Sequence, residues 1–169
     1  MIHVAPRMSP IRRYGFSYVE VLVSTLIVGG MMVTAMNLLG SVVKSRTTSG
    51  NYARAALLAQ QMICEITGVS YIDGSSPVFG LETGESTGNR SLFDDVDDYH
   101  GWTETPLKTR DNSTIANTTG WTRSVSVAWV DPALPSTTVA SDQGVKRITV
   151  TIQRSGQTLA TISLLRASL

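Results

Sequence analysis

Apolar residues dominate a stretch near the N-terminus of this 169-residue chain. From Val21 to Val43 there are 23 consecutive residues without a formally charged side chain. A helix needs about 20 apolar residues to cross a bilayer. The pattern therefore predicts a membrane-spanning helix over residues 16–43. The preceding residues 1–15 are polar and basic, and Pro6 and Pro10 disfavour a helix through them.

The helical pattern continues in amphipathic form over residues 44–69. Apolar side chains recur there at intervals of three and four residues, which is typical of one buried helix face. Gly68 follows the last periodic position, as expected at a helix end. The simplest interpretation is one long helix from about Phe16 to Thr67. The apolar positions of the predicted face are Tyr52, Ala56, Ala59, Ile63 and Ile66.

Residues 70–169 form the predicted globular region. Residues 70–120 are rich in Gly, Ser, Thr, Asn and Asp, so we expect mostly loop. Apolar and polar residues then alternate over 123–129, 147–153 and 160–164, which predicts three strands of a β-meander within residues 121–166. Ser155-Gly156 suits a tight hairpin turn. The predicted fold class is α+β, with the long N-terminal helix packed on a small C-terminal antiparallel β-sheet.

Composition narrows the function classes. The net charge is +1 and basic residues are not clustered, so nucleic acid is not expected as a primary partner. Cys64 is the one cysteine, which excludes an intrachain disulfide; we expect it to be a small buried hydrophobe. The chain has two histidines, no nucleophile elbow and no phosphate-binding glycine loop. We therefore expect no enzymatic activity.

Glu20 does not fit an ordinary membrane anchor. It lies within the apolar stretch, where a carboxylate near the centre of a spanning helix costs roughly 2.5–3.5 kcal/mol, and less near the end. An acidic residue inside a membrane segment is a functional hypothesis by default. Glu20 closes the run Gly15-Phe16-Ser17-Tyr18-Val19-Glu20. This run, behind a basic leader and before a long uncharged helix, resembles the prepilin peptidase site of type IV pilins and type II secretion pseudopilins.

The resemblance implies a maturation route. Prepilin peptidase would cut between Gly15 and Phe16, so that residues 1–15 are a leader and Phe16 is the new, commonly N-methylated N-terminus. The Glu20 carboxylate would then meet the Phe16 amine of a neighbouring subunit. Two unit charges about 4 Å apart gain roughly 4 kcal/mol at an effective dielectric near 20. No enzyme cofactor is implied.

The resemblance also implies a place and partners. The arginines of the leader predict that the N-terminal end stays in the cytoplasm, so the C-terminal region would face the periplasm. The chain would be a single-pass protein of the bacterial inner membrane before it joins a pilus or pseudopilus. Its partners would be prepilin peptidase, other pilin or pseudopilin subunits, the inner-membrane assembly platform and the lipid bilayer. The sequence does not distinguish pilus, secretion and DNA-uptake systems, nor tip from shaft.

The match departs from major pilins in the helix. Many major pilins carry a proline about twenty residues into the mature chain, whereas this helix has none and Asn37 lies near that point. Tyr14 stands where a basic residue usually precedes the glycine, and Tyr18 is bulkier than the usual residue. Together these departures favour a minor pilin or pseudopilin.

Two alternatives stay open. The chain could be a secreted binding module with a conventional signal peptide cut at the small residues Val33-Thr34-Ala35. It could also be a single-pass membrane-anchored module that keeps its N-terminus. Neither alternative explains Glu20 or the Gly15-Phe16 pair.

The loop carries one acidic cluster and Trp102, and Trp121 directly follows the loop. Calcium is a weak hypothesis for the acidic run, because hard oxygen ligands suit that ion and some major pseudopilins bind it in this domain. The spacing fails the EF-hand pattern, so a solvated acidic loop, or a helix start capped by Asp, is the favoured interpretation. We expect Trp102 and Trp121 to pack at sheet or loop edges. The acidic candidates are Asp94, Asp95, Asp97 and Asp98.

Overall fold

The structure is a computed structural model that describes residue 15 and residues 17–74 and 78–168. Most of the predicted leader and Phe16 lie outside the described residues. The chain divides into two compact units, residues 1–46 and residues 47–169.

Helix α1 spans Tyr18–Thr67 and forms the predicted long N-terminal helix. It begins after Ser17, whose carbonyl oxygen accepts hydrogen bonds from the backbone N–H groups of Glu20 and Val21 at 3.0 and 3.2 Å. It ends before Gly68, as predicted. A Cβ added at Gly68 would lie 3.3 Å from the Glu65 carbonyl oxygen, so the close approach of the chain at this end favours glycine.

The buried face of α1 lies in the second unit and differs in phase from the prediction. Tyr52 and Ala56 were expected in this face but are exposed, whereas Ala59, Ile63 and Ile66 are buried as predicted. The larger apolar side chains lie on the adjacent face of the helix, at positions four residues apart. These side chains, and not the small alanines alone, determine which face of the helix packs on the sheet. The buried residues are Ala55, Leu58, Ala59, Met62, Ile63 and Ile66.

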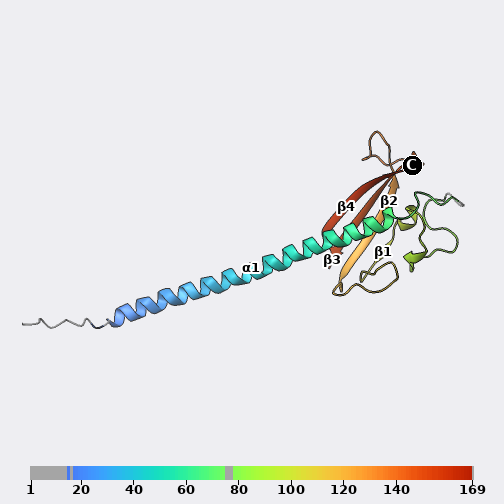
Figure 1. The fold of residues 1–169 in the computed structure, drawn as a ribbon. Helices are drawn as coiled ribbons and strands as arrows, with labels where there is room; N and C mark the ends of the chain where they lie inside the picture. Colours follow the sequence, from blue (N-terminus) through green and yellow to red (C-terminus); the bar gives the residue numbers. More distant parts are fainter. Residues whose placement is uncertain (1–14, 16, 75–77, 169) are drawn as a thin grey trace, which may run out of the picture. The chain divides into compact units, whose positions relative to one another are not determined.

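Four antiparallel strands form one sheet in the order β1-β2-β3-β4 (Figure 1). The predicted α+β class is therefore confirmed. The two-residue strand β1 was not predicted. The other three were, but β2 begins two residues earlier than predicted and ends where predicted, whereas β3 and β4 extend beyond the predicted strands at both ends. Among the described residues β4 pairs only with β3, so it is an edge strand. The bounds are Thr103–Glu104 for β1, Trp121–Trp129 for β2, Val145–Arg154 for β3 and Gln157–Ala167 for β4.

The turn between β3 and β4 is the predicted two-residue hairpin. Ser155 has φ 49° and Gly156 has φ 81°, so both central residues adopt the left-handed conformation. A type I′ turn requires this at both positions, and its twist matches that of the flanking strands. The turn thus sets the pairing of Arg154 with Gln157, and a register shift between Ile152 and Gln153 then places Val150 opposite Ile162.

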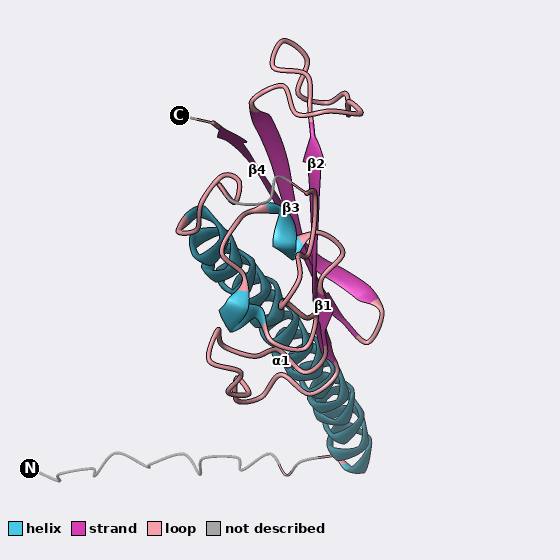
Figure 2. Ribbon diagram, turned by 90° about the vertical axis from the view of Figure 1, so that its right-hand side faces the viewer, coloured by secondary structure: helices cyan, strands magenta, loops and turns pink. Residues whose placement is uncertain are grey.

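The core of the second unit lies between α1 and the inward face of the sheet. Alternate residues of β2 and β3 point into it, as the two-residue period requires. The loops that cover it carry two short 3-10 helices, η1 (Arg90–Leu92) and η2 (Asp97–Tyr99), as Figure 2 shows. The core includes Val125, Val127, Ile148, Val150 and Ile152 from the strands, and Phe93, Val96, Tyr99 and Leu107 from the loops.

Three side chains differ from their predicted environments. Trp102 and Trp121 were expected to pack at sheet or loop edges; both pack, but they are buried in this core, at 4% and 2% exposure. Trp102 directly precedes β1 and Trp121 is the first residue of β2, and sequence position alone does not reveal how deeply such side chains are buried. Cys64 was expected to be buried but is exposed, because it points away from the face formed by Met62, Ile63 and Ile66.

Candidate functional site

The candidate assembly segment begins where the described chain begins. Gly15 and Ser17 are exposed and neither belongs to a helix or strand. Phe16, the predicted new N-terminus, lies outside the described residues. The predicted cleavage between Gly15 and Phe16 therefore stays a prediction.

Glu20 lies in the first turn of α1, in the first unit. It is the only charged residue between Tyr18 and Val43, and apolar side chains such as Val19 and Leu22 stand exposed on either side of it. Every side chain from Tyr18 to Gly50 is exposed. The helix is long and apolar enough to cross a membrane. The structure thus places one carboxylate at the beginning of an otherwise uncharged, uncovered helix surface.

The position of Glu20 also fits a helix cap. Ser17 and Glu20 have the S-x-x-E spacing of a capping box, in which each side chain bonds a backbone N–H of the first turn. Within the described residues, neither side chain makes such a bond, and the Glu20 carboxylate has no salt-bridge partner. The Glu20 carboxylate is therefore not engaged in a helix cap, and it remains available to a partner.

Several hydroxyl groups on the same surface of α1 already donate hydrogen bonds to backbone carbonyl oxygens. Thr25 donates to the Val21 carbonyl at 2.7 Å, Thr34 to the Met31 carbonyl at 2.8 Å and Ser41 to the Leu38 carbonyl at 2.8 Å. These bonds to the preceding turn are suited to lipid, where no water can satisfy a polar group. Glu20 differs from these residues, since its charge needs a partner outside the helix.

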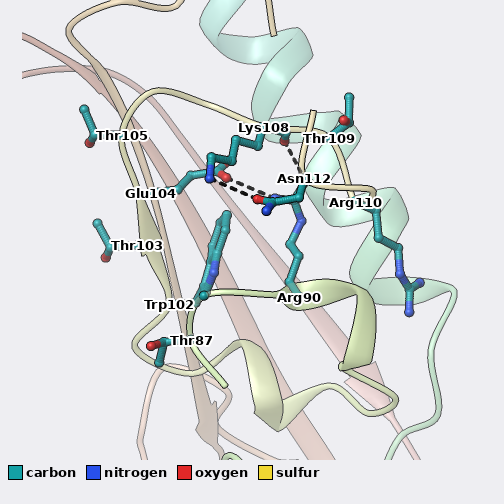
Figure 3. Close-up of a pocket in the computed structure, with 11 residues that line it drawn as sticks. Thr87, Arg90, Trp102, Thr103, Glu104, Thr105, Lys108, Thr109, Arg110 and Asn112 are labelled. Atoms are coloured by element: carbon teal, nitrogen blue, oxygen red, sulfur yellow. Dashed lines mark hydrogen bonds and ion pairs between the residues drawn. The ribbon is translucent and has the colours of Figure 1, made fainter. Parts of the chain in front are cut away.

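A small pocket in the second unit is the other candidate site (Figure 3). Its volume is about 210 Å³, below the roughly 300–1,000 Å³ of ordinary ligand pockets. Its cationic groups already have partners. Lys108 Nζ donates to Asn112 Oδ1 at 2.9 Å, and Arg110 Nη2 donates to the Phe93 carbonyl at 2.8 Å. Histidine and cysteine are absent from its described lining.

Two of the residues that line this pocket, Arg90 and Glu104, belong to a network of four charged side chains. We call it the charge network: Glu65, which is partly buried, and the buried Arg90, Glu104 and Arg123. Arg90 bonds Glu65 Oε1 through Nε at 2.7 Å and Glu104 Oε2 through Nη1 at 3.0 Å. Arg123 bonds Glu104 Oε1 through Nη2 at 2.5 Å. Arg90 and Arg123 are 4% and 0% exposed, and burial lowers the pKa of Arg123. Equal numbers of acids and bases make the network neutral, which suits its burial.

The charge network joins α1 to the loops and the sheet. Glu65 comes from α1, Arg90 from η1, Glu104 from β1 and Arg123 from β2. Its donors also bond backbone carbonyls, since Arg90 Nη2 and Arg123 Nη2 both reach the Lys108 carbonyl oxygen, at 2.6 and 2.7 Å. The arrangement therefore links α1, η1, β1 and β2 through paired charges.

The acidic run is folded into the protein and is not the solvated loop that we expected. Asp95, Asp97 and Asp98 are at most 2% exposed, whereas Asp94 is exposed. Asp95 Oδ1 accepts hydrogen bonds from the backbone N–H groups of Asp97 and Asp98, and Asp98 Oδ2 accepts from those of Asp94 and Asp95. The carboxylates thus satisfy the backbone of their own turn, which is the capping role that the sequence also allowed.

Asp97 is used differently. Its Oδ1 forms a salt bridge with Lys146 of β3, and its Oδ2 accepts from the Gly80 backbone N–H at 3.1 Å. The Lys146 ammonium also donates to the Tyr71 carbonyl and lies 4.4 Å from the centre of the Tyr71 ring. Asp95 and Asp97 of the predicted calcium candidates are therefore engaged in other contacts.

Crowding of carboxylates around η2 changes their proton affinity. Burial raises the pKa of Glu82 to about 7, helped by the nearby charges of Asp98, Asp95 and Glu85. Burial and the charge of Asp97 raise the pKa of Asp95 to about 6. Burial likewise raises the pKa of Asp98. These groups therefore hold protons more tightly in the folded chain than free carboxyls do.

Comparison with protein-family models, curated proteins and solved structures gives no match.

Sequence reasoning missed the charge network and the salt bridge of Asp97 with Lys146. The one available signal was periodicity. Arg123 occupies an inward position of β2 between Trp121 and Val125, and Lys146 precedes the inward Ile148 of β3 by two residues. A charged residue at an inward position indicates a buried partner of opposite charge.

Proposed function

We propose that this chain is a type IV pilin-like structural subunit, a minor pilin or pseudopilin, that is matured by prepilin peptidase and assembled through α1. The observation that carries the proposal is Glu20, the single charge at the start of an exposed apolar helix. The basic leader and the Gly15-Phe16 pair that precede it in the sequence support the same conclusion.

The proposed assembly step follows from the cost of an unpaired carboxylate in lipid. After cleavage, the new N-terminal amine of Phe16 is a cation at the end of one helix, and Glu20 is an anion one turn away on the helix of its neighbour. Pairing them contributes roughly 4 kcal/mol at about 4 Å and an effective dielectric near 20. The exposed apolar surface on either side supplies helix-to-helix packing. Subunits therefore leave the bilayer for a filament in which Glu20 is paired.

The same proposal assigns the rest of the chain. The apolar part of α1 holds the precursor as a single-pass protein in the bacterial inner membrane, and residues 47–169 form the periplasmic unit. We expect the subunit to be non-enzymatic, with assembly-platform components and other subunits as its partners.

The deciding experiment is intact mass and N-terminal sequencing of the chain from membranes of cells that contain a prepilin peptidase. We expect a mature chain that begins at Phe16. Gly15→Ala should leave the uncut precursor, because the resemblance makes Gly15 the last leader residue, directly before the cut. Gly30→Ala is the matched control, since an added Cβ at either glycine meets nothing within 4 Å.

Other outcomes select the alternatives. A chain that begins at Met36 would establish a conventional signal peptide and a secreted module. An intact N-terminus in peptidase-containing cells would establish a plain membrane anchor. Normal maturation of Gly15→Ala would refute the peptidase assignment.

A further inference from the structure

A second pocket of the second unit lies between α1 and the hairpin that joins β3 to β4. Its volume is about 360 Å³, which is within the range of ordinary ligand pockets, roughly 300–1,000 Å³. One wall is made by the part of α1 that opens the unit, because the unit begins at residue 47. The polar residues of its lining are Thr48, Asn51, Tyr52, Arg154, Ser155 and Gln157.

The pocket is at the end of the unit that the chain enters from the apolar part of α1. At the other end of the unit, Arg166 Nη1 donates to the carbonyl oxygens of Ile66 and Thr67, at 3.1 and 3.0 Å. β4 therefore follows α1 from the pocket to the last turn of the helix. The pocket thus involves the residues of this unit that come nearest in sequence to the uncharged run, which ends at Val43.

Two arginines at this end of the unit lie over the same tryptophan ring. The guanidinium carbon of Arg154 is 5.6 Å from the centre of the Trp121 ring, and that of Arg54 is 5.5 Å from it. A cation within about 6 Å of the centre of an aromatic ring is attracted to the face of that ring. The buried Trp121 thus holds the exposed Arg154 in place, and the two positive groups are no more than about 11 Å apart.

Neither arginine is neutralised by an acid. The salt bridges found among the described residues include neither Arg54 nor Arg154. Arg54 donates to two backbone carbonyl oxygens, which position its charge but do not cancel it. Residues 21–64 and 154–159, which supply both walls of the pocket, contain no acidic residue. Two uncompensated cations beside a polar pocket favour an anionic ligand.

The sequence places this pocket close to the surface of a bilayer that α1 crosses. Helix α1 is continuous over Tyr18–Thr67, and Thr48 follows Val43 by five residues. Five residues of helix are about 7.5 Å long. The headgroup zone on each side of the hydrocarbon core is about 5–8 Å thick. Thr48 is therefore at the outer edge of the lipid headgroups, and Tyr52, which is 42% exposed, is a residue type enriched at this interface.

We propose that this pocket binds the phosphate group of an anionic phospholipid of that bilayer. The planar guanidinium of Arg154 can bond two phosphate oxygens at once, and Arg54 adds a second positive charge. The side chains of Asn51 and Gln157 offer donors and acceptors to the hydroxyl groups of a glycerol headgroup. A zwitterionic choline headgroup would gain less, because its own ammonium offsets the phosphate charge and finds no acid in the described lining.

The site gives the second unit a docking position on the membrane before assembly. Lipid binding at this site rests on the part of the proposed function in which α1 spans a bilayer, and it needs neither cleavage before Phe16 nor pairing of Glu20. Extraction of the subunit into a filament would break the contact with the lipid. The lipid composition of the membrane would therefore influence how readily the subunit leaves it.

The test uses the full chain in micelles of a non-ionic detergent, titrated with short-chain phosphatidylglycerol or phosphatidylcholine. Native mass spectrometry counts the lipids bound to each chain. We expect one phosphatidylglycerol to bind saturably, phosphatidylcholine to bind at least about tenfold more weakly, and added salt to weaken the binding of phosphatidylglycerol. Glycerol phosphate in solution, added as a competitor, should bind at least about tenfold more weakly than the lipid, because the micelle concentrates the lipid around α1.

Arg154→Gln is the informative variant, because it removes the one charged side chain of the described lining, and that side chain is exposed. Its affinity for phosphatidylglycerol should fall at least about tenfold, while its unfolding midpoint in lipid-free micelles stays near that of the parent chain. Arg110→Gln is the matched control. It removes an exposed arginine of the same unit that lies outside this pocket, so the affinity for phosphatidylglycerol should not change.

Four results would overturn the proposal. They are the absence of saturable phosphatidylglycerol binding, equal affinity for the two lipids, unchanged affinity in Arg154→Gln, and an equal loss in Arg110→Gln, which would reveal attraction to overall charge. Competition by glycerol phosphate at the affinity of the lipid would identify a soluble phosphate as the ligand instead. N-terminal sequencing of the same preparation reports on the proposed function separately, because the uncut chain and a chain that begins at Phe16 both contain α1 and the pocket.

Discussion

Replacing Arg123 with methionine tests whether the charge network holds the second unit together. Arg123 is 0% exposed, and its guanidinium bonds Glu104 Oε1 through Nε at 2.9 Å and through Nη2 at 2.5 Å. It also bonds the Lys108 carbonyl at 2.7 Å. Methionine fills a similar volume but donates nothing. The variant would therefore bury one carboxylate oxygen and one carbonyl oxygen that have lost these donors.

The magnitude follows from the imbalance of charge. With Arg123 absent, Glu65 and Glu104 share the single guanidinium of Arg90. Breaking a buried pair by removing one partner costs about 3–5 kcal/mol. A domain is stable by only about 5–15 kcal/mol, so a third or more of the stability would be lost. For a unit of this size the unfolding midpoint should fall by about 10–20 °C.

Thermal unfolding of the full chain in micelles, followed by tryptophan fluorescence, measures this loss. Trp102 is a local probe, because its ring lies 4.9 Å from the Arg90 guanidinium and 5.8 Å from that of Arg123. Arg154→Met is the matched control on the neighbouring strand, where the arginine is exposed and should matter by less than about 1 kcal/mol.

A double variant separates pairing from packing. Arg123→Met combined with Glu104→Met removes both charges of the pair and leaves Arg90 with Glu65. Because apolar side chains can replace a buried ion pair at little cost, the double variant should be more stable than Arg123→Met alone. The reasoning is refuted if Arg123→Met unfolds within about 2 °C of Arg154→Met, or if the double variant is less stable than the single one.

Three further predictions address assembly, pH and packing. Glu20→Ala should still be cut before Phe16 but should join filaments poorly, and quantitative immunoblotting of sheared filaments that showed unchanged incorporation would remove the pairing role. The unfolding midpoint should fall as pH rises from about 4.5 to about 7, because raised carboxyl pKa values favour the folded chain only while the groups are protonated. Glu82→Gln should flatten this fall, and an unchanged pH profile would contradict the cause assigned to it. Ala59→Phe should cost at least about 1–3 kcal/mol by overpacking a fully buried position, whereas Ala56→Phe on the exposed face should be nearly neutral; equal unfolding midpoints would refute the observed helix phase.

Periodicity explains why the main elements were predictable. The uncharged run and the three-and-four spacing after it specify a helix, and strict alternation specifies β2, β3 and β4. The hairpin at Ser155-Gly156 was predictable because few residues tolerate the left-handed conformation that a type I′ turn needs. The phase of the helix was less certain, since alanines such as Ala55 and Ala56 contribute too little apolar area to decide which of them faces the sheet.

The buried charges could not be paired from sequence. Glu65, Arg90, Glu104 and Arg123 come from four elements that only the tertiary fold brings together. The acidic run was misjudged for a related reason. Acidic side chains are usually exposed to solvent, but here the backbone N–H groups of the same turn donate hydrogen bonds to them. Val96 and Tyr99 of this turn are buried in the core, so the acidic residues beside them are buried as well. The crowding of these acids with Glu82 and Glu85 arises because the loop folds back on that turn.

The open edge of β4 has a consequence for handling the isolated subunit. Among the described residues, no strand pairs with β4 on the side away from β3, so an edge eleven residues long is open, and Arg166 is the one charged side chain along it. A long edge with little charge is a template for strand addition by another chain. Concentrated preparations should therefore form intermolecular β-structure through β4, and a lysine at outward-facing Thr161 or Ser163 should suppress it.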